Sequence, residues 1–516
     1  MTEARAAGAD RRLGMGLVLA TGLVGVVVTL AVTAGLHRRP RVTEAALILV
    51  VLATFVVVGR RRIARLRLET VFDTCVLFLP LAAVIGPALA LPGRPQYFLF
   101  RLLLAASVPL GIAIIVERRR LPRLGPRNLV ILLAAWFAWL GIAFLWAPVK
   151  ADGVRYLVIL LVDVAVLAAV AAAGDTRRRL RFMTATLAVA YGLAVLVGSG
   201  EALTGIHPLS SRVAHGLGHA HDATGFFYNP NDFGTFIAIV WPYLLIALLF
   251  GRRTWLRLGA FAFMGLGFFC LLHTGSRSSL IAIGLTTLAA AVYVGARHMI
   301  RHRVLLTALT VVVLAVFAYF ALSNSQAPLV RQFRLQTIVQ EVQQGSGSGA
   351  TRVDLARAGY EAVAHYYFLG VGPGNAENQV ALQGIPSDFA NLHDWWAEVF
   401  VVGGLPGIVL YILLYAGMLV VSFRVAARTR DPFLRALAAA TGIALIGYAV
   451  GSFGPSTVVS FAPMWILFGL AFAVARRAHF EQLEESRAPT RPRRAAPATV
   501  GATADGTTAA TQAGAS

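Results

Sequence analysis

Charged residues are scarce in this sequence, and their scarcity excludes an ordinary soluble protein. They make up 14% of the 516 residues, whereas hydrophobic residues make up 58%. A soluble domain carries roughly a quarter charged residues. Together with a mean hydropathy of +0.71, the composition predicts an all-α polytopic membrane protein, because such frequent apolar runs cross a bilayer as helices.

Cysteine is rarer still. The chain contains two, Cys75 and Cys270, and both lie within apolar runs. This placement argues against a disulfide framework and against a thiolate metal site. Acidic residues are also few. The chain has 24 Asp and Glu and 46 Lys and Arg, which gives a net charge of +22. The Arg residues lie between apolar runs instead of forming one patch, so they indicate membrane topology, and we expect no nucleic-acid partner.

Apolar runs follow one another closely along the chain. Windows of about 20 apolar residues predict a bundle of about 12–14 membrane-spanning helices. The predicted spans are 14–36, 43–59, 71–91, 97–116, 128–147, 154–173, 182–199, 232–250, 255–273, 278–296, 303–322, 398–421, 433–452 and 458–475. The loops alternate between Arg-rich and Arg-poor, which places both termini in the cytoplasm by the positive-inside rule. One loop, HRRPR at 37–41, disagrees with this orientation.

One long polar stretch interrupts the apolar runs. On this basis we divide the chain into transmembrane helices at 1–322, a polar segment at 323–397, three further transmembrane helices at 398–480, and a tail at 481–516. The alternation of the loops puts the polar segment, with its short helices, on the extracytoplasmic face. The tail is rich in Ala, Thr, Pro and Gly and cannot bury a core, so we expect it to be disordered.

A short turn, HTGSRSS, holds Arg277 between two apolar runs. An Arg near the hydrocarbon costs about 2.5–3.5 kcal/mol at the bilayer centre and less at its surface. Its fork of donors suits a phosphate or diphosphate. Ser276 and Ser278 could cap the next helix and contribute to binding an anion there. The alternative is an interfacial Arg in a capped turn.

The turn FYNPND, which precedes another apolar run, is typical of a helix start. Asn231 or Asp232 is the expected cap of that helix, and Asn231 is also a candidate substrate-binding residue. Upstream, the run HGLGHAH resembles a metal-binding tract only loosely, because Asp222 is its one convincing carboxylate neighbour. We therefore expect no metal site there.

The polar segment contains a helical pattern followed by a glycine-rich turn. Arg352 lies at the start of the pattern, where a positive charge opposes the helix dipole. A surface helix gains nothing from Arg at that position, so we assign Arg352 a functional role. One side of the helix carries Val353, Ala356, Tyr360, Val363, Ala364 and Tyr367. In the turn GVGPGN, Gly372 and Gly374 could bring backbone close to a ligand or could simply reverse the chain.

The polar segment ends in NLHDWWAE. His393 titrates near neutral pH and can accept a proton from an attacking hydroxyl, and Asp394 or Glu398 could orient it. Trp395 and Trp396 could present flat faces to sugar rings or could anchor at the membrane surface. Asp394 has a structural alternative at a helix N-terminus, whereas no structural role explains His393.

The ordered set of these motifs resembles the O-antigen ligase/polymerase superfamily of membrane glycosyltransferases, which includes teichuronic acid and exopolysaccharide polymerases. The matching stretches, which run in the family's order from 225 to 411, are FYNPNDFGTF, HTGSRSSL, TRVDLARAGYEAV, GVGPGN and NLHDWWAEVFVVGGLPGIVLY. Each motif is weak by itself, whereas the ordered set is fairly specific. The N-terminal half matches only as a string of helices.

The resemblance implies a GT-C-like fold and sugar transfer with inversion, without a cofactor or a required metal. It implies that Arg277 and Arg352 hold the diphosphate of a polyprenyl-linked oligo- or polysaccharide donor. His393 would activate the hydroxyl of a glycan or lipid acceptor. The site would face outward from the cytoplasmic membrane, and proteins of a flippase or chain-length complex could be partners. The family usually has His-Asn where this chain has His393-Asp394.

A lipid-linked polysaccharide flippase or other transporter is the alternative function. Transporters bury charges or broken helices at the midplane of the bilayer. The predicted spans hold few charges, mainly Asp73, Asp163, Arg101 and Arg155 near their ends. Polarity gathers instead on the outer face, which favours an interfacial enzyme. The motifs do not separate a polymerase from a ligase.

Overall fold

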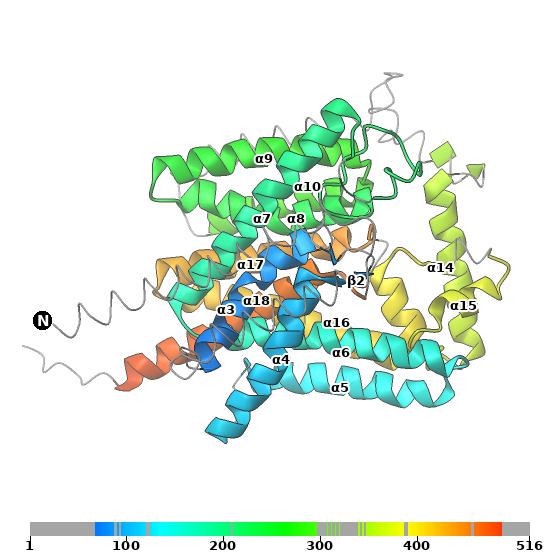
Figure 1. Ribbon diagram of the computed structural model, residues 1–516, viewed down its shortest axis with the longest axis horizontal. Coiled ribbons are helices and arrows are strands. Elements are labelled where there is room, and N and C mark those ends of the chain that lie inside the picture. Colours follow the sequence, from blue (N-terminus) through cyan, green and yellow to red (C-terminus); the bar gives the residue numbers. More distant parts are fainter. Residues whose placement is uncertain are drawn as a thin grey trace, which may run out of the picture.

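The chain forms a bundle of long helices, and Figure 1 shows most of them running side by side. The computed structural model describes residues 68–487, apart from 87–89, 92–93, 120–123, 208, 210, 386–390, 456–458 and most of 297–346. The elements before the polar segment are α3 (Leu68–Ile85), β1 (Ala90–Leu91), β2 (Arg94–Phe98), α4 (Leu99–Arg118), α5 (Arg127–Ala143), η3 (Phe144–Trp146), α6 (Lys150–Ala173), α7 (Arg177–Thr204), α8 (Pro230–Phe250), α9 (Thr254–Thr274) and α10 (Arg277–Ala296). The later elements are α14 (Gly347–His365), α15 (Ala376–Ala381), α16 (Trp395–Arg428), α17 (Pro432–Gly451) and α18 (Ala462–Arg487).

The predicted helical membrane fold is confirmed. Within the described residues, 10 helices are long and apolar enough to cross a membrane. The spans predicted at 14–36, 43–59 and 303–322 lie outside the described residues. The sequence did not predict the β1–β2 ribbon, whose antiparallel strands pair Ala90 with Phe98. Pro and Gly in the intervening LPGRPQ stretch favour a turn over a helix, which explains the ribbon.

The centre of the bundle is formed by α8, α17 and the first part of α18, where most residues are buried. Helix α17 packs between α8 and α10, and α18 packs against α6. Small residues allow this close approach, because bilayer lipids provide no hydrophobic force to bring helices together. At Gly447 of α17, an added Cβ would lie 2.3 Å from the Cγ2 of Thr286 on α10.

Helices α14 and α15 stand at one end of the bundle, and α18 finishes at the opposite end (Figure 1). Helix α18 continues to Arg487, so it extends past the predicted start of the tail at 481. The added stretch EQLEESR consists mainly of good helix formers, which explains the longer helix. Helix α16 is interrupted at Gly404 by a non-helical φ of 62°, just before Pro406.

The side of α14 that packs inward matches its predicted apolar side only at Val363, which is buried. Leu355, Ala358 and Ala362 are buried, whereas Val353 is 55% and Tyr360 56% exposed. Small residues decide the packing, because the helix lies close to α16. An added Cβ at Gly359 would lie 2.9 Å from the Cγ2 of Val401 on α16.

Candidate active site

The backbone of His393 is held in an uncommon conformation. Its φ is +48°, in the left-handed region that non-glycine residues rarely adopt. The side-chain oxygen of Asn391 accepts a hydrogen bond from the His393 N–H at 2.9 Å. On the other side, Asp394 caps α16 and accepts from Trp396 N at 2.9 Å. These two side chains fix the strained residue between a turn and a helix start, as is common at functional sites.

The imidazole of His393 donates a hydrogen bond to the backbone carbonyl of Pro455. Pro455 belongs to a turn, residues 452–455, that follows α17. The same turn holds the start of α16, since Ser452 O accepts from Trp395 N at 3.2 Å. A carbonyl only accepts, so the ring nitrogen that faces Pro455 acts as the donor and the second nitrogen of the neutral ring is the acceptor.

Charge and burial keep His393 neutral. Burial lowers the pKa of His393 first, the positive charges of Arg352 and Arg212 lower it further, and the bond to Pro455 partly opposes them. A pKa below the ordinary value of about 6.5 leaves the ring unprotonated near pH 7. Neutral imidazole is the form that acts as a general base.

Arg352 lies on α14 and faces the same site. Burial lowers the pKa of Arg352 first, the charge of Arg277 lowers it further, and the carboxylate of Asp394 opposes this change. The structure therefore brings the predicted residues Arg277, Arg352 and His393 within electrostatic range of one another. Two cations and one neutral base from three separate elements can bind an anion and remove a proton beside it.

The start of α10, which carries Arg277, is held by buried hydroxyl groups. The Ser276 hydroxyl lies 2.8 Å from that of Ser279 and 3.5 Å from that of Ser278. Thr235 of α8 donates to Gly451 O at 3.0 Å and lies 3.5 Å from Ser279 Oγ. These contacts join the starts of α8 and α10 to the end of α17, and they position Arg277 at the common junction.

The N-cap of α8 lies two residues before Asn231. Asn229 is the N-cap of α8, and its side chain accepts from Asn231 N at 2.9 Å. The prediction that Asn231 or Asp232 caps this helix is therefore wrong. Pro230 explains the shift, because proline favours the first helical position and leaves the preceding residue as the cap. Asn231 is partly exposed in the first turn of α8.

The glycine-rich turn lies against other helices. Gly372 and Gly374 have φ of +89° and +71°. An added Cβ at Gly374 would lie 2.2 Å from the backbone oxygen of Asp152 on α6, and one at Gly372 would lie 2.7 Å from the Cβ of Ala147. Both glycines thus allow the polar segment to dock on the start of α6, and in this structure their close approach is to protein backbone.

The two tryptophans pack into the helix bundle. Trp395 is fully buried and donates from Nε1 to the Tyr411 hydroxyl at 2.6 Å. Trp396 donates from Nε1 to Ala449 O at 2.8 Å. Glu398, one turn further along α16, accepts a hydrogen bond from the hydroxyl of Tyr156 on α6. These three side chains pack against neighbouring helices and hold the start of α16 in place. In the described structure their contacts are therefore with the protein itself.

Two groups that act on His393 were not among the predicted site residues. The sequence shows Arg212 within a loosely metal-like loop, and its position 181 residues before His393 hides their proximity. Pro455 acts through its carbonyl, which every residue possesses, so no side-chain pattern could have identified it. In the described part of the chain, no group of three or more His, Cys, Asp or Glu could hold a metal ion.

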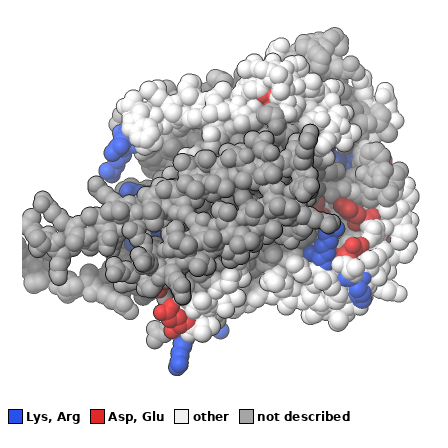
Figure 2. Space-filling view, viewed as in Figure 1, with Lys and Arg blue, Asp and Glu red and all other residues white. Residues whose placement is uncertain are grey.

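The surface agrees with this placement of the site. Figure 2 shows Arg, Lys, Asp and Glu side chains at the end where α14 and α15 lie and also at the opposite end, whereas the flank over α9 is largely free of them. An uncharged flank suits contact with lipid, and a charged end suits contact with water.

Comparison with known proteins adds two findings. A family described as O-antigen ligase matches residues 262–412, a stretch that contains Arg277, Arg352 and His393. The curated protein named teichuronic acid biosynthesis protein TuaE, from Bacillus subtilis (strain 168), is 22% identical over 465 residues. That alignment covers 88% of this chain and 94% of the relative.

Proposed function

We propose a glycan-transfer function for this chain, whose resemblance to the O-antigen ligase/polymerase superfamily is confirmed by the family match and the full-length relative. The chain is a multi-pass membrane protein of the kind that makes surface polysaccharides. In the proposed reaction it moves a glycan from a polyprenyl diphosphate onto an acceptor hydroxyl, as a polymerase or a ligase.

One observation carries the proposal, namely the meeting of two arginines with one neutral histidine at one end of an apolar bundle. The residues come from α10, α14 and the segment before α16, so no local fold requires them to meet. Two guanidinium groups near each other suit the binding of a phosphate or diphosphate anion. A lipid diphosphate supplies that anion at the membrane surface, where its polyprenyl chain can remain in the bilayer.

The proposed chemistry is a direct displacement. The acceptor hydroxyl gives its proton to the free ring nitrogen of His393, and its oxygen forms a bond to the anomeric carbon. The bond from that carbon to the diphosphate breaks, and the diphosphate leaves with both electrons. Arg277 and Arg352 stabilise the charge that develops on it. Attack from the side opposite the leaving group inverts the anomeric carbon, and the arginines fill the role that a metal ion would otherwise have.

We place the site on the extracytoplasmic face of the cytoplasmic membrane. The Arg-rich loops support this orientation by the positive-inside rule, since α14 and the end of α18 lie at opposite ends of the bundle (Figure 1). The donor is an oligo- or polysaccharide on polyprenyl diphosphate, and the acceptor is a glycan or a lipid. The relative's name refers to teichuronic acid biosynthesis, which supports a surface polysaccharide as the product.

The test measures glycan transfer by the purified protein in detergent or vesicles, with a polyprenyl-diphosphate-linked oligosaccharide as donor. We expect His393→Ala and Arg352→Ala to reduce transfer at least about a hundredfold, since each removes a group used in the transition state. The matched control is Arg357→Ala, which removes an 81% exposed arginine of the same helix that pairs with Glu361 at 3.0 Å. Normal transfer by both site variants would refute the proposal.

A flippase remains a second candidate because of one buried carboxylate. Asp163 of α6 is 3% exposed, and within the described residues its Oδ2 has no hydrogen-bond partner. Ionisable groups within a membrane-spanning helix commonly mark a transport path. The discriminating measurement follows a lipid-linked glycan across vesicles that contain the purified protein. Translocation lost in Asp163→Asn and retained in His393→Ala would favour the flippase.

A further inference from the structure

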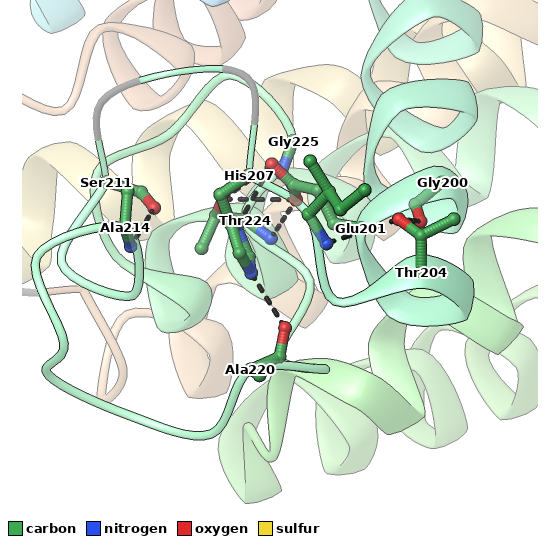
Figure 3. A network of polar contacts seen from close by, with 10 residues as sticks. Gly200, Glu201, Thr204, His207, Ser211, Ala214, Ala220, Thr224 and Gly225 are labelled. Carbon is green, nitrogen blue, oxygen red and sulfur yellow. Dashed lines mark hydrogen bonds and ion pairs between the residues drawn. The ribbon is translucent and has the colours of Figure 1, made fainter.

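The segment between α7 and α8, residues 205–229, is closed by a buried carboxylate that the proposed mechanism does not use. Glu201, in the last turn of α7, is 1% exposed. Figure 3 shows its carboxylate directed at the segment. It accepts hydrogen bonds from Thr224 N and Gly225 N, each at 2.7 Å, and from the Thr224 hydroxyl at 3.0 Å. A buried carboxylate is costly unless it is satisfied in this way.

His207 completes this arrangement from the other end of the segment. Its side chain is 5% exposed, and Nδ1 lies 3.4 Å from Glu201 Oε1, an ion pair when the ring is protonated. Its Nε2 lies 2.9 Å from Ala220 O. Because a carbonyl only accepts, Nε2 is the donor. We call Glu201, His207 and Thr224 the loop clasp, since Thr224 is hydrogen-bonded to Glu201 and His207 packs against the same carboxylate.

The loop clasp holds a segment that carries Arg212. The Arg212 N–H donates to Tyr228 O at 2.9 Å, and its Nε donates to Leu217 O at 3.0 Å. These bonds fix both the backbone of Arg212 and the direction of its guanidinium group. Tyr228 directly precedes the N-cap of α8, so Arg212 lies beside the junction of α8, α10 and the turn after α17.

A second attachment brings the segment close to Arg277. Ala223 N donates to the backbone oxygen of His273 at 3.0 Å, near the end of α9 and four residues before Arg277. The segment is thus bound on one side to the turn that carries Arg277 and on the other to the start of α8. The charge of Arg212 reaches His393, where it acts together with that of Arg352.

We propose that Arg212 is a third binding residue for the donor diphosphate and that the loop clasp is its positioning device. The inference rests on the proposed function. A diphosphate leaving group presents several charged oxygens, more than two guanidinium forks satisfy, and arginine is suited to bidentate contact with them. The loop clasp holds the third fork in place before the donor arrives, which reduces the entropy lost on binding.

The first experiment compares Arg212→Ala and Arg212→Lys with the wild-type protein in the glycan-transfer assay. We expect Arg212→Ala to raise the KM for the donor about tenfold to a hundredfold, with a smaller rise for Arg212→Lys, because a charged hydrogen bond is lost or weakened. Arg212→Ala should also raise the pKa of His393, because Arg352 is then the one remaining arginine of the two whose charge lowers it. The acid limb of the pH profile should therefore move to higher pH. Arg357→Ala is the exposed-arginine control.

The second experiment is a double-mutant cycle that separates positioning from folding. Glu201→Gln should raise the donor KM in the wild-type background and cause no further rise when Arg212 is already alanine. Thr224→Val, which removes one hydrogen bond to Glu201, is the milder variant should Glu201→Gln not fold. If Glu201→Gln raised the donor KM by the same factor with and without Arg212→Ala, the positioning role of Glu201 would be overturned.

The outcomes also separate this inference from the function on which it rests. A wild-type protein that transfers no glycan refutes the proposed function. A wild-type protein that is active, with an unchanged donor KM and an unchanged acid limb in Arg212→Ala, overturns the inference alone.

Discussion

Asn375 is the residue whose loss should most clearly release the polar segment from the helix bundle. Its side chain is fully buried. Its Oδ1 accepts from Val149 N at 2.8 Å, and its Nδ2 donates to Val149 O at 3.3 Å and to Pro373 O at 2.8 Å. Asn375→Ala removes these three hydrogen bonds while leaving room for the smaller side chain.

The expected magnitude follows from these bonds. Each is worth about 1 kcal/mol, so their loss should lower the free energy of local opening by about 3 kcal/mol. A change of this size corresponds to about a 150-fold increase in the open fraction. The amides of Val371 and Gly372 report on it, because they donate to Val401 O at 2.9 Å and Val402 O at 3.1 Å across the docked turn. Their hydrogen exchange should accelerate by the same factor.

The assay is hydrogen–deuterium exchange with mass spectrometry on peptides that cover the turn, in the purified protein. Asn378→Ala is the matched control, since this residue lies three positions further along, is exposed, and makes one hydrogen bond to Asp152 at 3.1 Å. We expect the control to change exchange less than about threefold, because exposed substitutions are nearly neutral. Equal acceleration in both variants would show that Asn375 does not anchor the turn.

Two further predictions concern the same segment. Gly374→Ala should lower the free energy of unfolding by about 2–5 kcal/mol through backbone strain and overpacking against Asp152. Gly384 has a φ of +91° and open space around it, so Gly384→Ala should lower the free energy of unfolding by only about 1–2 kcal/mol. Equal losses in the two variants would contradict the close approach of Gly374 to Asp152. The value of kcat/KM should fall only below about pH 6.5, because the lowered pKa of His393 keeps the ring neutral to more acidic pH. A fall in kcat/KM that already begins above about pH 6.5 on the acid side would contradict this prediction.

The sequence singled out the three residues that the structure brings near one another, because few residue types can bind an anion or accept a proton at a bilayer surface. A guanidinium near the hydrocarbon is costly, so Arg277 was informative by its position alone. His393 had no structural explanation, and the structure indeed holds it at a positive φ. Their meeting with Arg352 could not be derived from spacing, because it depends on how α8, α10 and α17 pack.

The direction in which a side chain points was harder to predict than which residue types matter. Trp395 lies beside His393 in the sequence, yet its ring points into the bundle and contacts Trp136 and Tyr411. Successive residues at a helix start point to different sides, so neighbours in sequence need not share a site. Most of the predicted apolar side of α14 stayed exposed for a related reason, since small residues such as Ala358 permit the closer helix contact, and of that side Val363 is buried.

The pairing of His393 with Asp394 in place of the family's usual His-Asn acquires a physical interpretation. Asn and Asp cap helices about equally well, and Asp394 caps α16 through Trp396 N and Ala397 N, so either residue would fix the backbone that follows the histidine. The carboxylate differs from the amide in its charge and in having no N–H donors, and its field acts on Arg352. Asp394 therefore keeps the capped backbone that follows the histidine while it opposes part of the positive charge of Arg352.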